Sequence, residues 1–175
     1  DLDNRLSVYI VSDRLTASQG DLTVTVLTLD GKVINKIQKK VSIAANISKN
    51  VLSMETEQLI KGNSKSEVVI QTRLADKAGK IYTNNYFLLQ QKAINYPLVT
   101  ISKQIKPIDG GYEVQLTADK FARAVFMSLN GIDNFFENNY FDILPGETVS
   151  VKVTSTLSES DFGKQLKIVS LSDAY

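Results

Sequence analysis

Closely spaced carboxylates are the one residue pattern in this chain that could support enzymatic chemistry. Hydrolysis of a glycosidic bond requires two carboxyl groups that flank the scissile bond. Three pairs are candidates for this role: Glu55 with Glu57, Asp142 with Glu147, and Glu159 with Asp161. The first pair suits the opening turn of a helix, where acids are favoured, and the last lies in a polar stretch. We therefore interpret all three as solvated surface charge and predict no catalytic residue.

Other catalytic and metal-binding chemistry lacks its residues. The chain has no histidine and no cysteine, which excludes Ser-His-Asp and Cys-His nucleophiles and the usual zinc ligands. Gly110-Gly111 is a turn doublet rather than a phosphate-binding loop, because no helix is predicted after it. Acids spaced as in a calcium loop are absent too. We expect no cofactor and no metal ion, and the lack of cysteine leaves the redox compartment undetermined.

Aromatic residues offer a binding function instead. Six rings could form a platform for stacking sugars: Tyr82, Tyr86, Phe135, Phe136, Tyr140 and Phe141. Two observations favour a core role for many of them, since there is no tryptophan and half of the rings in alternating strands point inward. As the sugar-binding hypothesis we single out Tyr82, Phe135, Phe136 and Tyr140.

Composition indicates a folded protein that does not bind nucleic acid or membranes. Of 175 residues, 43% are hydrophobic and 22% charged, which is typical of folded domains. The net charge of +1 argues against a surface for polyanions. No apolar run approaches the ~20 residues of a membrane span. Because the chain opens Asp1-Leu2-Asp3 without an initiator methionine, we expect a processed protein or an excised fragment.

Alternation of apolar and polar residues predicts an all-β protein. About twelve short strands follow one another at intervals typical of antiparallel sandwiches, with hairpin turns at Asp30-Gly31 and Asn130-Gly131. The one predicted helix is a short one over residues 53–62, capped by Ser53, and residues 157–163 are predicted as a polar loop. Tyr96-Pro97 divides the chain into two predicted sandwich domains, residues 1–95 and 96–175.

The most distinctive segment is Phe136-Glu137-Asn138-Asn139-Tyr140-Phe141-Asp142-Ile143-Leu144-Pro145-Gly146-Glu147, followed by the strand Val149-Ser150-Val151. It resembles the C-terminal immunoglobulin-like domain of β-mannosidases, in glycoside hydrolase family two. In that family a "DNYFDLLPGE"-like segment precedes a valine-rich strand. Here Asn138 stands where Asp is common and Ile143 where Leu is common. Residues 117–126 and 166–171 resemble the same domain.

The first half is similar to the preceding immunoglobulin-like domain of these enzymes, through residues 8–15, 29–33 and 44–48. The resemblance implies two tandem immunoglobulin-like sandwiches with at most one short helix. It also implies a parent enzyme that removes terminal β-linked mannose by a retaining mechanism, with two glutamates in an N-terminal (β/α)₈ barrel. Nothing here matches that barrel.

We therefore expect a non-catalytic accessory region whose partner is the rest of the parent enzyme. The alternative is a carbohydrate-binding or adhesion module that uses exposed aromatics, with a manno-oligosaccharide as its partner.

Overall fold

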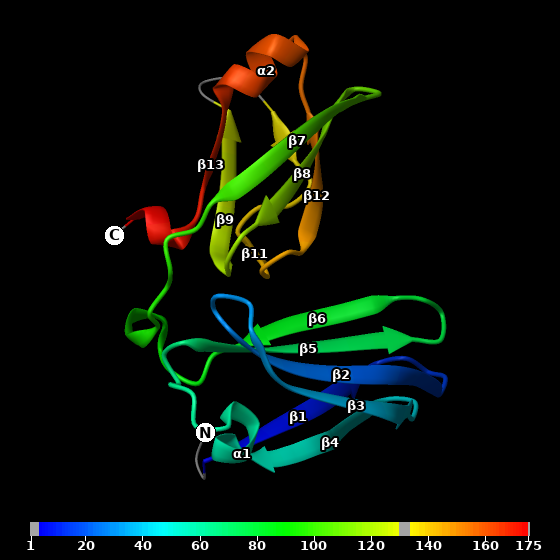
Figure 1. Ribbon diagram of the computed structural model, residues 1–175. Coiled ribbons are helices and arrows are strands. Elements are labelled where there is room, and N and C mark those ends of the chain that lie inside the picture. Colours follow the sequence, from blue (N-terminus) through cyan, green and yellow to red (C-terminus); the bar gives the residue numbers. More distant parts are fainter. Residues whose placement is uncertain (1–3, 130–133, 175) are drawn as a thin grey trace. The chain divides into compact units, whose positions relative to one another are not determined.

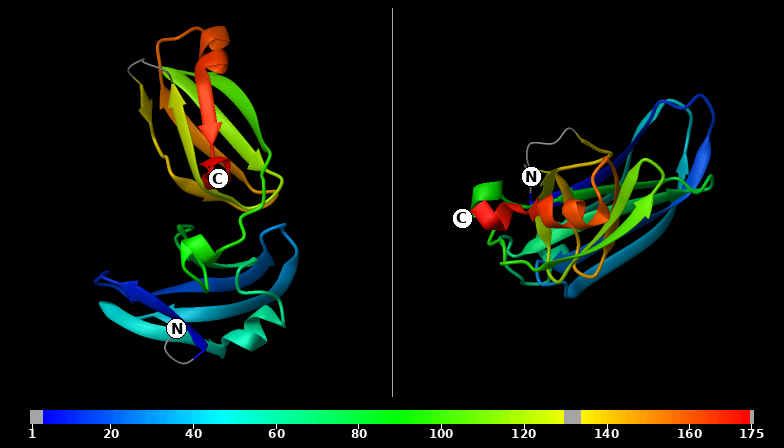
Figure 2. Two further views of the ribbon diagram at one scale, coloured as in Figure 1. Left: turned by 90° about the vertical axis from the view of Figure 1, so that its left-hand side faces the viewer. Right: turned by 90° about the horizontal axis from the view of Figure 1, so that it is seen from above.

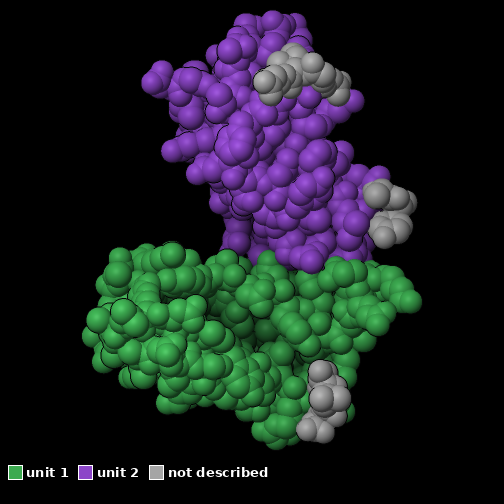
Figure 3. Space-filling view, turned by 180° about the vertical axis from the view of Figure 1, so that it is seen from behind, with its two compact units in different colours: residues 1–28, 32–95 green, residues 29–31, 96–175 purple. Residues whose placement is uncertain are grey.

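The alternating apolar residues form antiparallel strands in the computed structural model, which describes residues 4–129 and 134–174. The all-β fold class predicted from the sequence is confirmed. The chain divides into two compact units, coloured separately in Figure 3. Unit 1 comprises residues 1–28 and 32–95, and unit 2 comprises residues 29–31 and 96–175. None of the helices in the described ranges is long and apolar enough to cross a membrane.

Unit 1 is a sandwich of a four-stranded and a two-stranded antiparallel sheet (Figure 1 and Figure 2). The large sheet has the order β3-β2-β5-β6, and the small sheet pairs β1 with β4. Buried side chains from both sheets and from α1 form one core, which includes Ile10, Val24, Val51, Leu59 and Ile70. The elements are β1 (Arg5–Ser12), β2 (Ser18–Thr28), β3 (Val33–Ile43), β4 (Ile47–Glu55), α1 (Thr56–Ile60), β5 (Val68–Asp76), β6 (Ile81–Tyr86) and the 3₁₀ helix η1 (Gln91–Ala93).

The turn between β2 and β3 differs in detail from its prediction. The sequence pair Asp30-Gly31 suits a two-residue turn in which both residues have positive φ. In the structure Gly31 has a φ of 96°, whereas Asp30 does not adopt positive φ. The register also shifts between Val26 and Leu27, so the hairpin closes through a longer loop. The extra residue of this bulge lies in β3, whereas β2 pairs with β5 without a shift. Leu27 is buried opposite the buried Val69, so this end of β2 is covered on both faces.

The helix of unit 1 is shorter than the sequence predicts. Residues 53–55 continue β4, and α1 begins only at Thr56. Ser53 is therefore no cap, and the actual N-cap, Glu55, makes no side-chain capping bond. Pairing of Ser53 with Ser7 across the small sheet prevails over the local helical preference. At the other end the helix stops at Lys61, which adopts a left-handed conformation before Gly62.

Unit 2 is a second sandwich, of a four-stranded sheet β10-β12-β8-β7 and a three-stranded sheet β11-β9-β13. Its core residues alternate along β8 and β12, where Val114 faces Val151 across the ladder. The elements are β7 (Ile101–Ile108), β8 (Gly111–Ala118), β9 (Ala122–Leu129), β10 (Phe135–Phe136), β11 (Phe141–Ile143), β12 (Thr148–Thr154), α2 (Glu159–Gln165), β13 (Leu166–Val169) and the 3₁₀ helix η2 (Leu171–Ala174). The predicted turn at Asn130-Gly131 lies outside the described residues.

Residues 157–163, predicted as a loop, belong largely to the helix α2, so the described chain has two α-helices rather than at most one. Ser158 caps this helix, because its Oγ accepts a hydrogen bond from the Asp161 backbone N–H at 3.2 Å. Phe162 then turns inward, is fully buried and stacks on Tyr112 with ring centroids 4.1 Å apart. The signal was present as a Ser-x-x-Asp capping pair, but Gly163 within the segment favoured a loop.

The segment that carries the family resemblance has a structural role in unit 2. Asn139 acts as a strand partner of Met127, since its Oδ1 accepts from the Met127 N–H at 2.7 Å and its Nδ2 donates to the Met127 carbonyl at 2.8 Å. Asp142 holds a bulge in β9, where it accepts from the Ala124 N–H at 3.1 Å and from Arg123 at 2.5 Å. Ala124 has a positive φ of 49°, a conformation that this bulge imposes.

Candidate functional site

A cleft of about 850 Å³ opens in unit 1 beside the small sheet. One wall is β1 over its whole length, from Arg5 to Ser12, with the following residues to Arg14. The other wall is formed by side chains of β5 and β6. The two-stranded sheet is too narrow to cover the whole inner face of the four-stranded sheet. The part of that face near β6 therefore stays open and forms the cleft. Its volume lies in the range of about 300–1,000 Å³ that is usual for ligand sites.

Three side chains of β6 project into this cleft from the core-facing side of the sheet. Tyr82, Asn84 and Tyr86 pair directly with Leu74, Thr72 and Ile70 of β5, and directly paired residues share a face. Ile70 is fully buried in the core, which identifies the face as the inner one. Tyr82 nevertheless stays 40% exposed and Tyr86 38% exposed. The β6 side of the cleft is therefore lined by two tyrosine side chains with an asparagine side chain between them.

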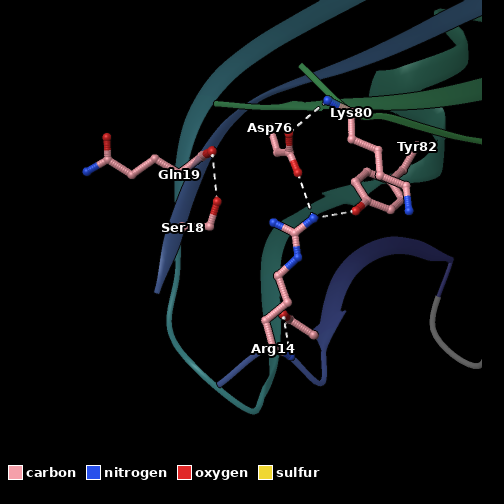
Figure 4. A network of polar contacts seen from close by, with 7 residues as sticks. Arg14, Ser18, Gln19, Asp76, Lys80 and Tyr82 are labelled. Atoms are coloured by element: carbon pink, nitrogen blue, oxygen red, sulfur yellow. Dashed lines mark hydrogen bonds and ion pairs between the residues drawn. The ribbon is translucent and has the colours of Figure 1, made fainter. Parts of the chain in front are cut away.

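Arg14 lines the cleft in a fixed position, and Figure 4 shows its guanidinium hydrogen-bonded to Asp76 and Tyr82. Its Nη2 donates to Asp76 Oδ2 at 2.8 Å and to the Tyr82 hydroxyl oxygen at 2.7 Å. Asp76 is itself held, because its Oδ1 accepts from the Lys80 backbone N–H at 2.9 Å. The Lys80 ammonium lies 5.1 Å from the centre of the Tyr82 ring. These contacts orient a guanidinium and a phenol before any ligand arrives.

The ion pair in this network shifts the acidity of both partners. The hydrogen bond from Arg14, together with the Lys80 backbone N–H, lowers the pKa of Asp76 below its ordinary value, although burial of the carboxylate opposes this. The Asp76 side chain is only 2% exposed. The same hydrogen bond raises the pKa of Arg14. The pair is therefore fully ionised near neutral pH, and its charges cancel locally.

Because the pKa of Asp76 is lowered in the folded state, the stability of unit 1 must depend on pH. The folded state binds the Asp76 proton less readily than the unfolded state, so the free energy of unfolding must fall as the pH drops. The contribution is complete above the unfolded-state pKa of about 3.9 and is lost as the pH falls through the lower folded-state pKa. We expect urea unfolding, followed by circular dichroism between about pH 6 and pH 2, to show this loss.

The matched variant for this experiment is Asp76→Asn. It should be less stable than the wild type at neutral pH and should show a flatter dependence on pH, because the group that titrates is gone. Parallel pH profiles for the two proteins would contradict the assignment.

The residues predicted to bind sugar do not come together in one unit. Tyr82 lies in the cleft of unit 1, whereas Phe135, Phe136 and Tyr140 belong to unit 2. Phe136 packs against the core of unit 2. Phe135 is 68% exposed, and Tyr140, 69% exposed, stacks on Phe126 with ring centroids 4.8 Å apart.

Four of the six carboxylates in the predicted pairs have structural partners. Glu55 forms an ion pair with Arg5, and Glu57 lies 3.9 Å from Lys65. Asp142 supports the β9 bulge, and Asp161 belongs to the cap of α2. Within the described residues no group of three or more potential ligands could hold a metal ion.

The cleft contains residues that sequence reasoning did not select. Arg14 and Asp76 are 62 positions apart and belong to no recognisable motif, so only the fold brings them together. Asn84 was not selected either, although it lies between the two tyrosines that were considered as sugar-binding rings. The spacing of Tyr82, Asn84 and Tyr86 shows that they share one face of β6. That this face is the inner one, and that the small sheet leaves it open, follows only from the structure.

Comparison with known families decides the relationship. Residues 4–92 match the family described as a mannosidase Ig/CBM-like domain. The chain belongs to this family. Residues 96–174 match a second family, an Ig-fold domain named for mannosidase. The resemblance to the immunoglobulin-like domains of β-mannosidase is thereby confirmed.

Solved structures share the fold. This mannosidase-type chain is similar to the β-D-mannosidase of Dictyoglomus thermophilum, with a TM-score of 0.77 and 20% identity over 97% of this chain and 20% of that one. It is also similar to the exo-chitosanase CsxA of Amycolatopsis orientalis, with a TM-score of 0.58 and 17% identity over 96% of this chain and 24% of that one. This chain thus spans about a fifth to a quarter of the proteins it matches. Curated protein sequences give no match.

Proposed function

We propose that this chain is the non-catalytic C-terminal accessory region of a β-mannosidase-like glycoside hydrolase. In this role its two sandwiches support the catalytic barrel of the parent protein, which removes terminal β-linked mannose from oligosaccharides. The observation that carries the proposal is the tandem match to two mannosidase-type domains, over residues 4–92 and 96–174. The shared fold with a β-mannosidase over 97% of this chain supports the same order of domains.

The described side chains also favour an accessory role. Retaining hydrolysis needs two carboxyl groups about 5–5.5 Å apart with a sugar between them. Two of the acids that could pair in this way are engaged, Glu55 with Arg5 and Asp142 with Arg123 and the Ala124 N–H. An ion pair that fixes a strand or a bulge leaves a carboxylate poorly placed to attack or protonate a sugar.

Hydrolysis of 4-nitrophenyl β-D-mannopyranoside tests this proposal. The protein encoded by the complete reading frame should release nitrophenol, and the 175-residue chain alone should not. Turnover by the chain alone would contradict the accessory role, because it would require catalytic residues within these two sandwiches.

A further inference from the structure

We propose that the cleft of unit 1 is a binding site for an uncharged oligosaccharide. The site is formed by Tyr82, Asn84 and Tyr86 of β6, by β1 and by Arg14. This proposal goes beyond the accessory role and does not depend on it, because every residue of the site lies in unit 1.

The spacing of the tyrosines suits a ligand longer than one sugar ring. Residues i and i+4 on a strand lie about 13 Å apart, at about 3.3 Å per residue. Tyr82 and Tyr86 therefore offer two aromatic surfaces at separate points along the cleft, with Asn84 between them. Aromatic side chains with a polar tip combine an apolar surface for the C–H faces of a pyranose with a hydroxyl for hydrogen bonding. A carboxamide adds both donors and an acceptor, as vicinal hydroxyl groups require.

Arg14 supplies further donors in a fixed orientation. Both of its side-chain hydrogen bonds come from Nη2, to Asp76 and to Tyr82. A guanidinium has five N–H donors, so Nη1 and Nε keep donors that bond to no residue in the described part of the chain. The Arg14 side chain is 43% exposed, which leaves these donors accessible to a ligand. Because its position is already set, a ligand does not have to order this long side chain.

The charge of the cleft disfavours an anionic ligand. Its charged lining residues are two basic and two acidic ones: Arg5, Arg14, Asp13 and Asp76. Arg14 is paired with Asp76, and Arg5 with Glu55 outside the lining. A phosphate or carboxylate ligand would find no uncompensated positive charge here. A polyhydroxylated neutral ligand gains hydrogen bonds from the same groups without a charge to match.

An extended peptide fits this cleft less well, although β1 is an edge strand of the two-stranded sheet. The opposite wall presents Thr72 and Asn84 where the side chains of an added strand would need apolar pockets. The hydroxyl groups of a sugar can instead form hydrogen bonds with these polar side chains.

Titration with β-1,4-linked mannotriose, followed by calorimetry and by backbone amide NMR shifts, tests the proposal. We expect millimolar binding, with shifts concentrated in β1, β5 and β6. Tyr86→Ala and Asn84→Ala should each weaken binding about tenfold or more, which corresponds to about 1.4 kcal/mol. Asn84 is exposed, so its variant keeps the fold and isolates the loss of ligand contacts.

The matched control is Phe135→Ala, which removes an exposed ring of unit 2 outside the cleft and should leave affinity unchanged. Cellotriose distinguishes a general oligosaccharide site, which binds both sugars, from one selective for mannose. No heat and no shifts at millimolar concentrations of either sugar would overturn the proposal. Loss of binding on Phe135→Ala, or binding that tolerates both cleft variants, would also overturn it.

Discussion

Replacing Val151 with aspartate should unfold unit 2. Val151 lies in the middle of β12, is 1% exposed and faces Val114, which is fully buried, across the ladder. An aspartate at this position would be buried without a partner, which costs several kcal/mol. A whole domain is stable by only about 5–15 kcal/mol. Backbone amide NMR should show loss of the dispersed signals of unit 2, while those of unit 1 persist because its core shares no residue with that of unit 2.

The control for this experiment is Ser150→Asp, one position earlier on the same strand. Ser150 is exposed and pairs with Gln115, so the same charge is introduced on the solvent side. We expect little change in stability for this variant. If Val151→Asp melted like the wild type, or if both variants unfolded alike, the direction of the β12 side chains would be wrong.

Gly111→Ala should cause the second large loss of stability. The added methyl group would lie 2.0 Å from the carbonyl oxygen of Val153 and 3.0 Å from the Ser155 nitrogen. Both obstacles are backbone atoms in or directly after β12, so no rotation of a side chain relieves the clash. We expect a cost at the upper end of the range of about 1–3 kcal/mol for overpacking, because β8 must move away from β12. For a domain of this size the melting temperature should fall by roughly 10–20 °C.

Gly163→Ala is the matched control for the glycine substitution. Gly163 lies within α2, and the nearest atom to its added methyl group is Ile105 Cδ1 at an ordinary 3.8 Å. Alanine in a helix is about 0.5–1 kcal/mol better than glycine, so this variant should melt slightly higher. Differential scanning calorimetry compares the two directly. A Gly111→Ala protein as stable as the wild type would contradict the close approach of these strands.

Strands were the most predictable part of this fold, because their signal is local. The alternation of Val149, Val151 and Val153 with polar residues is enough to define β12 and its buried face. In β3 (Val33–Ile43) the same alternation leaves Val41 and Ile43 buried on either side of the exposed Ser42. Helices were less predictable. Ser53 carried a capping signal that cross-strand pairing overrode, and Ser158 carried one that a following glycine obscured.

The candidate site was only partly predictable. The cleft forms because the sheet opposite β6 has only two strands, and the local sequence does not show how many strands a sheet will have. Tyr82 was selected as an aromatic residue, and its place beside Arg14 follows from the fold. The aromatic segment around Tyr140 illustrates the reverse case. Its ring density suggested a sugar platform, but Asn139 and Asp142 are held by backbone groups of β9, and Phe136 packs on the core. The residues of this segment that resemble the family therefore hold unit 2 together, through contacts with β9 and with the core.

The activity of the complete reading frame tests the central claim most directly. We predict that it encodes a barrel N-terminal to these sandwiches and that the purified protein hydrolyses 4-nitrophenyl β-D-mannopyranoside, whereas the 175-residue chain at equal concentration does not. A reading frame without a glycoside hydrolase barrel, or a complete protein that leaves the β-mannoside intact, would contradict the account.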